Sequence, residues 1–233
     1  MIDRYAIFSD FKEINKRYGL SGEEFTVPNY NASPSQQLPV VTNLNKKEIS
    51  FLFWGLNKAW SNNKSISNKL ISVDVESVQS KGPLLSALMK RRCLIPADGF
   101  YFWKQYGKKR KTPHYFHKSD DELFSLIGIW EEFEDMDGNS NLTFKILERP
   151  NYSGIEEFGP KMPVIISSDD EIRFLDDYTS EEEIFNILLN DEAVAGLSNH
   201  PVSPHISNPS NNSKELIQAQ SQVDQLGNYT LFD

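Results

Sequence analysis

Short apolar runs, separated by residues that favour turns, recur along most of the chain. They predict strands at Tyr5–Phe8, Val40–Val41, Ile49–Trp54, Cys93–Lys104, Pro113–His117, Leu123–Phe133, Leu142–Leu147 and Val164–Ile166. The second and third of these are expected to pair, and hairpins are expected to link the three strands between Cys93 and Phe133. Residues Pro28–Pro39 hold too many helix breakers for a helix and are expected to form a loop.

Fewer segments carry the start and stop signals of helices. The first helix is expected from about Asp10 to Tyr18, with Asp10 and Glu13 as a capping box and Gly19 as its end. A short helix is expected at Leu84–Lys90, after Pro83. Two later helices open with the expected capping boxes Ser168–Glu171 and Ser180–Glu183.

No internal repeat and no flexible linker divides the chain of 233 residues, and 39% apolar residues can close a substantial core. The order of elements predicts an α+β protein with one domain over residues 1–217, built on a curved or barrel-like, mostly antiparallel sheet with peripheral helices. The polar residues 218–233 are expected to form a C-terminal extension. The sequence shows neither a signal peptide nor an apolar run of about 20 residues, which predicts a cytoplasmic protein without a membrane partner.

The formal net charge of −9 argues against strong, indiscriminate binding of nucleic acid, because basic side chains supply most of that affinity. Two patches are basic although the net charge is negative: Lys90–Arg92, and Lys104 with 108–111 around the turn at Tyr106-Gly107. Each is either a solvated helix end or hairpin tip, or a local contact for phosphate. The single cysteine, Cys93, lies in an apolar run and is expected to be a buried, inert thiol.

Other constellations give weak signals. His114 and His117 would face opposite sides of a strand, which disfavours a shared metal site. A hydrolytic pair of Ser203 and His205 has no evident third residue to orient it. The chain has no glycine-rich nucleotide loop, so no cofactor is expected.

The run from Arg92 to Trp103, RCLIPADGFYFW, closely resembles the signature strand of the SRAP family, the SOS response-associated peptidases or abasic-site processing proteins. Shorter matches follow the family order along nearly the whole chain: Met1 with Arg4, Tyr30–Pro34, Phe53–Leu56 with Trp60, Ile71–Ser77, Gly128–Glu131, Lys161–Ile165, Pro201–Ser203, Asn208 and Leu216–Ile217.

This resemblance implies action on abasic sites in single-stranded DNA during the DNA damage (SOS) response. Family members use a cysteine at position two, whose α-amine attacks the sugar aldehyde and whose thiol closes a thiazolidine ring. A glutamate on the signature strand and a histidine before the Met-Pro pair serve proton transfers. Asparagine and arginine position the sugar and the phosphates.

Carried over residue by residue, these catalytic positions hold Ile2, Phe102 and Gly159, none of which can perform the chemistry. Ile2 should also keep Met1 attached. Asp3 stands where the family has glycine. The family pattern N-A-R-x-E is Ser72-Val73-Asp74-Val75-Glu76 here, so an acid replaces a phosphate-binding arginine. We interpret the chain as a family scaffold that has lost catalysis.

Several matching residues remain candidates for lining a DNA-binding groove without covalent chemistry: Arg4, Asn31, Trp60, Ser72, Glu76, Lys161 and Ser203. Each also has a structural interpretation. Arg4 would pair with an acid at a sheet edge, Asn31 would satisfy backbone groups of its loop, and Trp60 would cover the core.

Three hypotheses follow from these residues. The favoured one is a catalytically inactive binding module, with weak affinity for single-stranded DNA at most. The second is an active cross-linking enzyme that uses a substitute amine, from Met1 or Lys161. The third is a reused groove in which Phe102 and Gly159 leave an apolar pocket for a peptide or small molecule.

Overall fold

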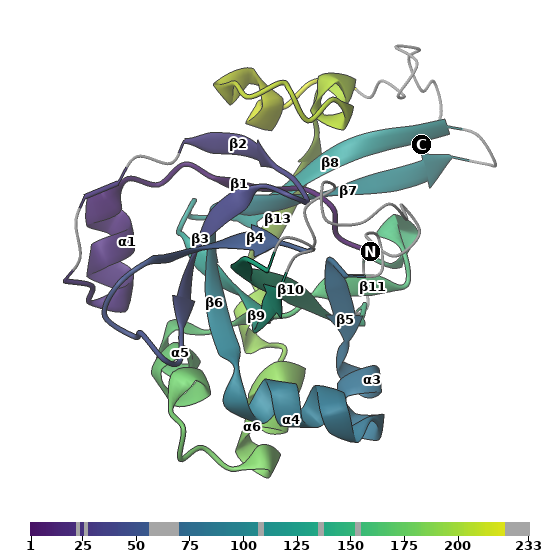
Figure 1. Cartoon of the computed structure of the whole chain (residues 1–233). Helices are drawn as coiled ribbons and strands as arrows, with labels where there is room; N and C mark the ends of the chain where they lie inside the picture. Colours follow the sequence, from purple (N-terminus) through teal and green to yellow (C-terminus); the bar gives the residue numbers. More distant parts are fainter. Residues whose placement is uncertain are drawn as a thin grey trace.

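A computed structural model of the chain describes residues 1–21, 24–25, 28–55, 70–106, 110–134, 138–151 and 155–221. Five strands close into a barrel: β3 (Gln37–Thr42), β4 (Ser50–Trp54), β10 (Ser140–Pro150), β9 (Phe124–Glu134) and β6 (Arg92–Ala97). The pairing of β9 with β10 closes the ring, and only β4 and β10 run parallel within it. The predicted α+β class with a barrel-like, mostly antiparallel sheet is therefore confirmed (Figure 1).

Short strands extend this barrel at its edges. β5 (Ser72–Asp74) runs parallel to β10, while β11 (Lys161–Pro163) and β12 (Ile165–Ile166) run antiparallel to β10 and β9. The predicted strand at Leu142–Leu147 lies within β10, and the one at Val164–Ile166 contains β12. Residues Val40 and Ser50 form one of the predicted pairs between β3 and β4.

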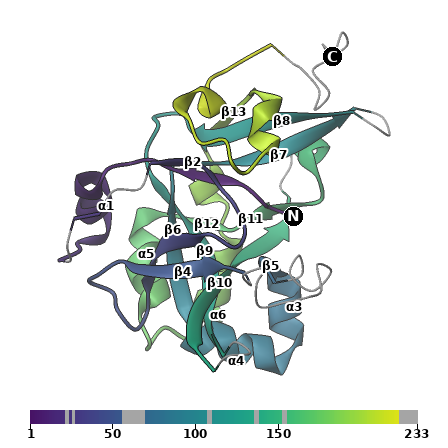
Figure 2. The same cartoon turned by 45° about the horizontal axis from the view of Figure 1, so that its top comes forward.

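A second, antiparallel sheet has the order β13 (Leu197–Pro201), β8 (Arg110–Lys118), β7 (Gly99–Tyr106), β1 (Tyr5–Ile7) and β2 (Asn29–Ala32). One face packs on the main core through Phe100 and Phe116. The other face forms a smaller core through Tyr101 and Tyr115, which is covered by the turns η4 (Pro204–Ser207) and η5 (Lys214–Ile217). Figure 2 shows these turns lying over the sheet.

The helices lie at the periphery: α1 (Phe11–Tyr18), α3 (Val75–Ser80), α4 (Gly82–Lys90), α5 (Ser168–Leu175) and α6 (Glu181–Leu189). The capping boxes predicted at Asp10–Glu13 and Ser180–Glu183 are both present, and Gly19 ends α1 in the left-handed conformation. The cap predicted for α5 was wrong by one residue. Ser167 caps that helix through the Asp170 amide, which leaves Glu171 to bind Arg17 and Ser125 instead.

The predicted strand Cys93–Lys104 was also wrong, because it is two strands in two different sheets. The chain passes from β6 to β7 at Asp98, which is buried and whose Oδ2 accepts hydrogen bonds from the amides of Phe8 (2.5 Å) and Ser9 (2.9 Å). Asp98 thereby ties the end of β1 to the crossing point. At Gly99 the Tyr115 ring lies 2.3 Å from where a Cβ would stand, so this close approach requires glycine.

The predicted loop at Pro28–Pro39 was partly wrong as well, because β2 and the start of β3 lie within it. β2 pairs with β1, with Tyr5 opposite Ala32, and the register shifts between Tyr5 and Ile7. Its residues Asn29, Tyr30 and Asn31 offer no apolar run, so tertiary pairing decides their conformation. β13 was also not predicted, because its sequence has no apolar run and its conformation depends on pairing with β8.

Arg92, the first residue of the signature strand, connects two helix ends to the barrel. Its guanidinium is buried and donates to the carbonyls of Met89 (2.6 Å) at the end of α4 and Phe174 (2.5 Å) at the end of α5. It also donates to the Asp176 carbonyl (2.8 Å). Because the last carbonyls of a helix have no partner within it, Arg92 caps both helices at once.

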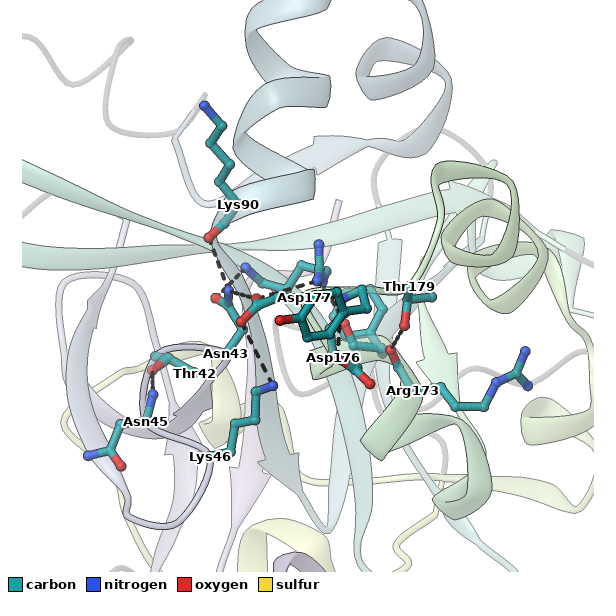
Figure 3. A network of polar contacts seen from close by, with 12 residues as sticks. Thr42, Asn43, Asn45, Lys46, Lys90, Arg173, Asp176, Asp177 and Thr179 are labelled. Carbon is teal, nitrogen blue, oxygen red and sulfur yellow. Dashed lines mark hydrogen bonds and ion pairs between the residues drawn. The ribbon is translucent and has the colours of Figure 1, made fainter.

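Asn43 completes this network (Figure 3). Its amide nitrogen donates to the Lys90 carbonyl (3.1 Å) and to the Asp177 carboxylate (2.9 Å). Its amide oxygen accepts from the Arg92 backbone and from the indole of Trp130, both at 3.1 Å. Asp177 also lies 3.9 Å from the ammonium of Lys46. The network thus joins the barrel to α4 and to the segment after α5.

Within the described ranges, none of the helices is both long and apolar enough to span a membrane.

Candidate functional site at the amino terminus

Ile2 lies in the main core, and its side chain is fully buried. Its backbone N–H donates to Oε1 of Glu148 on β10 at 2.6 Å, and the Met1 amine lies 3.5 Å from the same oxygen. Glu148 is itself buried. The position at which the family resemblance places the nucleophile is therefore occupied by a core-packing isoleucine, with a buried carboxylate beside the amino terminus.

Ser72 of β5 donates from its hydroxyl to Oε2 of Glu148 at 2.6 Å, so both carboxylate oxygens are hydrogen-bonded. Two residues further along β5, Asp74 forms an ion pair with Lys161 of β11, with 2.5 Å between Nζ and Oδ1. β10 lies between these two strands, since it pairs with both. We refer to Met1, Ile2, Ser72, Glu148 and the Asp74–Lys161 pair as the N-terminal site.

Asp3 and Arg4 follow the site along the chain. The Arg4 guanidinium donates to the Asp3 carbonyl at 2.5 Å and lies 3.7 Å from its carboxylate. Burial raises the pKa of Asp3, although the positive charges of Arg4, the amino terminus and Lys111 oppose this rise. Arg4 thus pairs with an acid, as its structural interpretation expects, but the acid is its own neighbour and the pair precedes β1, an inner strand of the second sheet.

Phe102 lies on β7 with only 4% of its surface exposed. Its ring packs edge-on against Phe100 and Phe116, with centroids 5.5 and 5.9 Å away. Gly159 lies after the turn η2 (Glu156–Phe158) with φ of 128°, a conformation that residues with side chains rarely adopt. The backbone here suits glycine, while Phe102 fills core space.

His114 of β8 lies directly across from Phe102 and is 5% exposed. Its Nδ1 is 2.9 Å from the side-chain oxygen of Asn199, and its ring packs edge-on against Phe158 at 4.9 Å. Its Nε2 is buried without a hydrogen-bond partner. Burial lowers the pKa of His114, which favours the neutral ring with Nδ1–H donating to Asn199.

The remaining candidates that the structure describes make none of the contacts that define this site. Asn31 is fully buried, and its amide donates to the carbonyls of Ile206, Asn208 and Asn211 at 3.2, 2.9 and 3.0 Å, which fastens the segment around η4 to β2. Glu76 is exposed in the first turn of α3. Ser203 is the N-cap of η4 and accepts from the amide of His205 at 3.3 Å. Trp60 lies outside the described residues.

The structure brings together Ile2, Ser72, Asp74 and Lys161 from the predicted set. Sequence reasoning missed Glu148 and the position of His114 beside Phe102. A glutamate following the apolar residues Ile146 and Leu147 of a buried strand was the available signal for Glu148, because buried carboxylates need partners. In the part of the chain that the structure describes, no group of three or more His, Cys, Asp or Glu residues is arranged to hold a metal ion.

The fold described above, a five-stranded barrel joined to a second antiparallel sheet, can now be compared with known protein families. A family model described as SOS response associated peptidase (SRAP) matches residues 1–209, and the chain belongs to this family.

Among its relatives, abasic site processing protein YoqW of Bacillus subtilis (strain 168) is 29% identical over 225 residues, which cover 94% of this chain and 100% of that protein. Abasic site processing protein HMCES of Xenopus tropicalis is 24% identical and covers 82% of this chain and 66% of its own. A crystal structure of a protein from Bacteroides thetaiotaomicron has the same fold, with a TM-score of 0.74, 20% identity and coverage of 93% of this chain and 99% of that one.

Proposed function

We propose that this SRAP protein binds single-stranded DNA at abasic sites without forming the thiazolidine cross-link. The observation that carries the proposal is Ile2, whose aliphatic side chain is buried where the family nucleophile would stand. A thiazolidine needs an amine and a thiol on adjacent carbons, and the only thiol of the chain is Cys93, on β6. The names of the relatives, abasic site processing proteins, support the choice of DNA.

The proton-transfer positions support the same conclusion. Phe102 packs among rings, and the backbone at Gly159 disfavours any residue with a side chain. Asp74 holds the Lys161 ammonium in an ion pair, so Lys161 is engaged and the position before helix α3 is acidic. Binding would therefore rest on shape and on cations elsewhere, and we expect weak affinity.

The test is incubation with single-stranded DNA that carries one abasic site, read on a native gel and on a denaturing gel. A shift on the native gel that disappears under denaturing conditions is expected. A denaturation-resistant adduct without reducing agent would overturn the loss of cross-linking. No shift at all would overturn DNA binding and favour a peptide or small molecule as the ligand of the site.

A second candidate function is reversible imine chemistry at the Met1 amine. The specific observation is Glu148, whose Oε1 lies 3.5 Å from that amine and could exchange a proton with it. The amine would attack the sugar aldehyde and expel water to form an imine, which borohydride reduces to a stable amine. An adduct that appears only with borohydride would identify this reaction, and blocking the amine by acetylation should abolish it.

A further inference from the structure

The hairpin of β7 and β8 carries a distinct face that leads away from the N-terminal site. Its register places three pairs of residues directly opposite each other: Phe102 with His114, Lys104 with Thr112, and Tyr106 with Arg110. Because side chains alternate along a strand, these residues share one face of the hairpin. The face is apolar at Phe102 and becomes aromatic and cationic toward the hairpin end.

The outer part of this face is accessible. Arg110 is exposed, and among the described residues it has no ion-pair partner. The Lys104 ammonium lies 5.4 Å from the centre of the Tyr106 ring, and it pairs at 3.0 Å with Glu157, a carboxylate that is 51% exposed. A half-buried aromatic ring is thus flanked by two cations on a projecting strand pair.

The hairpin lies beside the amino terminus, as both views show (Figure 1, Figure 2). The Tyr101 amide donates to the Arg4 carbonyl at 3.1 Å, so Arg4, two residues after Ile2, lies beside β7, which continues from Tyr101 to Tyr106. The charge of Lys111, on β8, also acts on the Asp3 carboxylate. A strand of DNA with its abasic nucleotide at the N-terminal site would therefore pass next to this hairpin.

We propose that the face formed by Lys104, Tyr106 and Arg110 binds the nucleotides that flank the abasic site. The Tyr106 ring would stack on a neighbouring base, since every base offers a π-face. Arg110 would contact a phosphate directly, and Lys104 would do so by exchanging the exposed Glu157 carboxylate for a phosphate. This deepens the proposed function and rests on it. It would also supply phosphate contacts to a chain of net charge −9 that has Asp74 in its N-terminal site and Asp3 beside it.

The experiment measures fluorescence anisotropy of a labelled single-stranded oligonucleotide with one abasic site, at several salt concentrations. In the double variant Lys104→Gln/Arg110→Gln, the slope of log affinity against log salt should fall by about 1.4, because each phosphate contact on a single strand contributes about 0.7. Tyr106→Ala should weaken binding about tenfold with little change in the salt slope, as expected for the loss of one stacked base.

The matched control is Lys12→Gln/Lys16→Gln on α1, which removes the same charge from exposed positions at the other end of the molecule (Figure 1). It should leave the slope near that of the wild type. If the wild type binds and the hairpin variants bind equally well, or if the α1 control loses as much, the hairpin proposal is wrong while the proposed function stands. If the folded wild type does not bind at all, the proposed function fails first. Circular dichroism shows that each variant is folded.

Discussion

Glu148 engages three groups through one carboxylate: the Ile2 amide, the Ser72 hydroxyl and, at 3.5 Å, the Met1 amine. A buried carboxylate is stable only when its oxygens accept hydrogen bonds, so this arrangement holds the amino terminus against β10. The amino terminus therefore has an acidic partner, Glu148 on β10. The position at which the family resemblance implies a glutamate holds Phe102 instead. At the scale of single residues, the site has an amine and a carboxylate but no thiol.

His114 predicts how stability depends on pH. Its pKa is lowered by burial, with Lys104 and His200 in the same direction and with Asn199 and Glu157 opposing it. The unfolded chain therefore takes up a proton near the ordinary value of 6.5 while the folded chain does not. The contribution of His114 to the free energy of unfolding is present above that pH and is lost as the pH falls toward the folded pKa.

Urea unfolding between pH 8 and pH 5 checks this. The free energy of unfolding of the wild type should fall more steeply below pH 6.5 than that of His114→Gln, which keeps a donor for Asn199. His205→Gln is the control for replacing a histidine by glutamine at an exposed position. Parallel profiles for wild type and His114→Gln would show that the ring titrates normally in the folded state.

A second residue prediction concerns the crossing between the two sheets. Gly99→Ala places a methyl group 2.3 Å from the Tyr115 ring, which must move within a packed face. Overpacking of this kind costs about 2 kcal/mol of unfolding free energy. Gly82→Ala at the start of α4 is the control, since nothing lies within 4 Å of its Cβ position, and it should cost nothing. Equal midpoints in urea for both variants would contradict the crowding at Gly99.

Arg92 binds the ends of both α4 and α5, so its removal should destabilise the last turns of both helices. Arg92→Leu keeps an apolar stem but leaves the carbonyls of Met89, Phe174 and Asp176 without their donor. We expect a loss of about 3 kcal/mol or more, because several buried acceptors become unsatisfied. Hydrogen exchange should accelerate in the last turns of α4 and α5 in particular.

The control for this prediction is Arg173→Leu. Arg173 is 55% exposed and pairs at 2.9 Å with Asp170, a buried carboxylate that also accepts from the Ser167 hydroxyl at 3.0 Å. The pair is open to solvent at Arg173, and Asp170 keeps its contact with Ser167, so this variant should lose about 1 kcal/mol and stay much closer to the wild type. A similar loss for the two variants, or faster exchange in only one helix after Arg92→Leu, would refute the role of Arg92 as a shared cap.

Among the elements, those with local signals were predictable. Asp10 with Glu13, Ser180 with Glu183, and Gly19 mark helix ends because their side chains or backbone act within one turn. β2 and β13 carry no such signal, since their pairing partners lie far away in the sequence. Asp98-Gly99, after Pro96, was an available turn signal for the break between β6 and β7. The change of sheet shows only in the structure, where Asp98 accepts from the amides of Phe8 and Ser9.

For the molecule as a whole, the family resemblance indicated the architecture, while the site residues that it implies stay a prediction. The resemblance could not indicate which residues lie around the amino terminus. Glu148 binds the terminus across 146 positions of sequence, and Asp74 meets Lys161 only because β10 lies between their strands. Contacts between residues so far apart in the sequence follow no spacing rule, so the electrostatics of the site had to come from the structure.

The last prediction asks whether the scaffold still presents an abasic site to its amino terminus. Ile2→Cys restores an aminothiol once Met1 is removed, which a small second residue favours. We expect this variant to give an adduct with abasic single-stranded DNA that survives denaturation without borohydride. The reaction should be slow, because Phe102 and Gly159 offer no proton transfer.

Ile2→Ser is the matched control, because it also removes a buried aliphatic side chain and permits loss of Met1 but supplies no thiol. Both variants should lose about 2–4 kcal/mol of unfolding free energy, so circular dichroism and mass spectrometry must first show folded protein of the expected mass. An adduct with Ile2→Cys but not with Ile2→Ser would mean that the abasic sugar still reaches the amino terminus. The side chain at position 2 would then decide between noncovalent binding and a covalent cross-link. The contrary outcome is a folded, processed Ile2→Cys variant that binds the DNA but forms no adduct. That result would mean that the abasic sugar does not reach the amino terminus and the Glu148 carboxylate beside it.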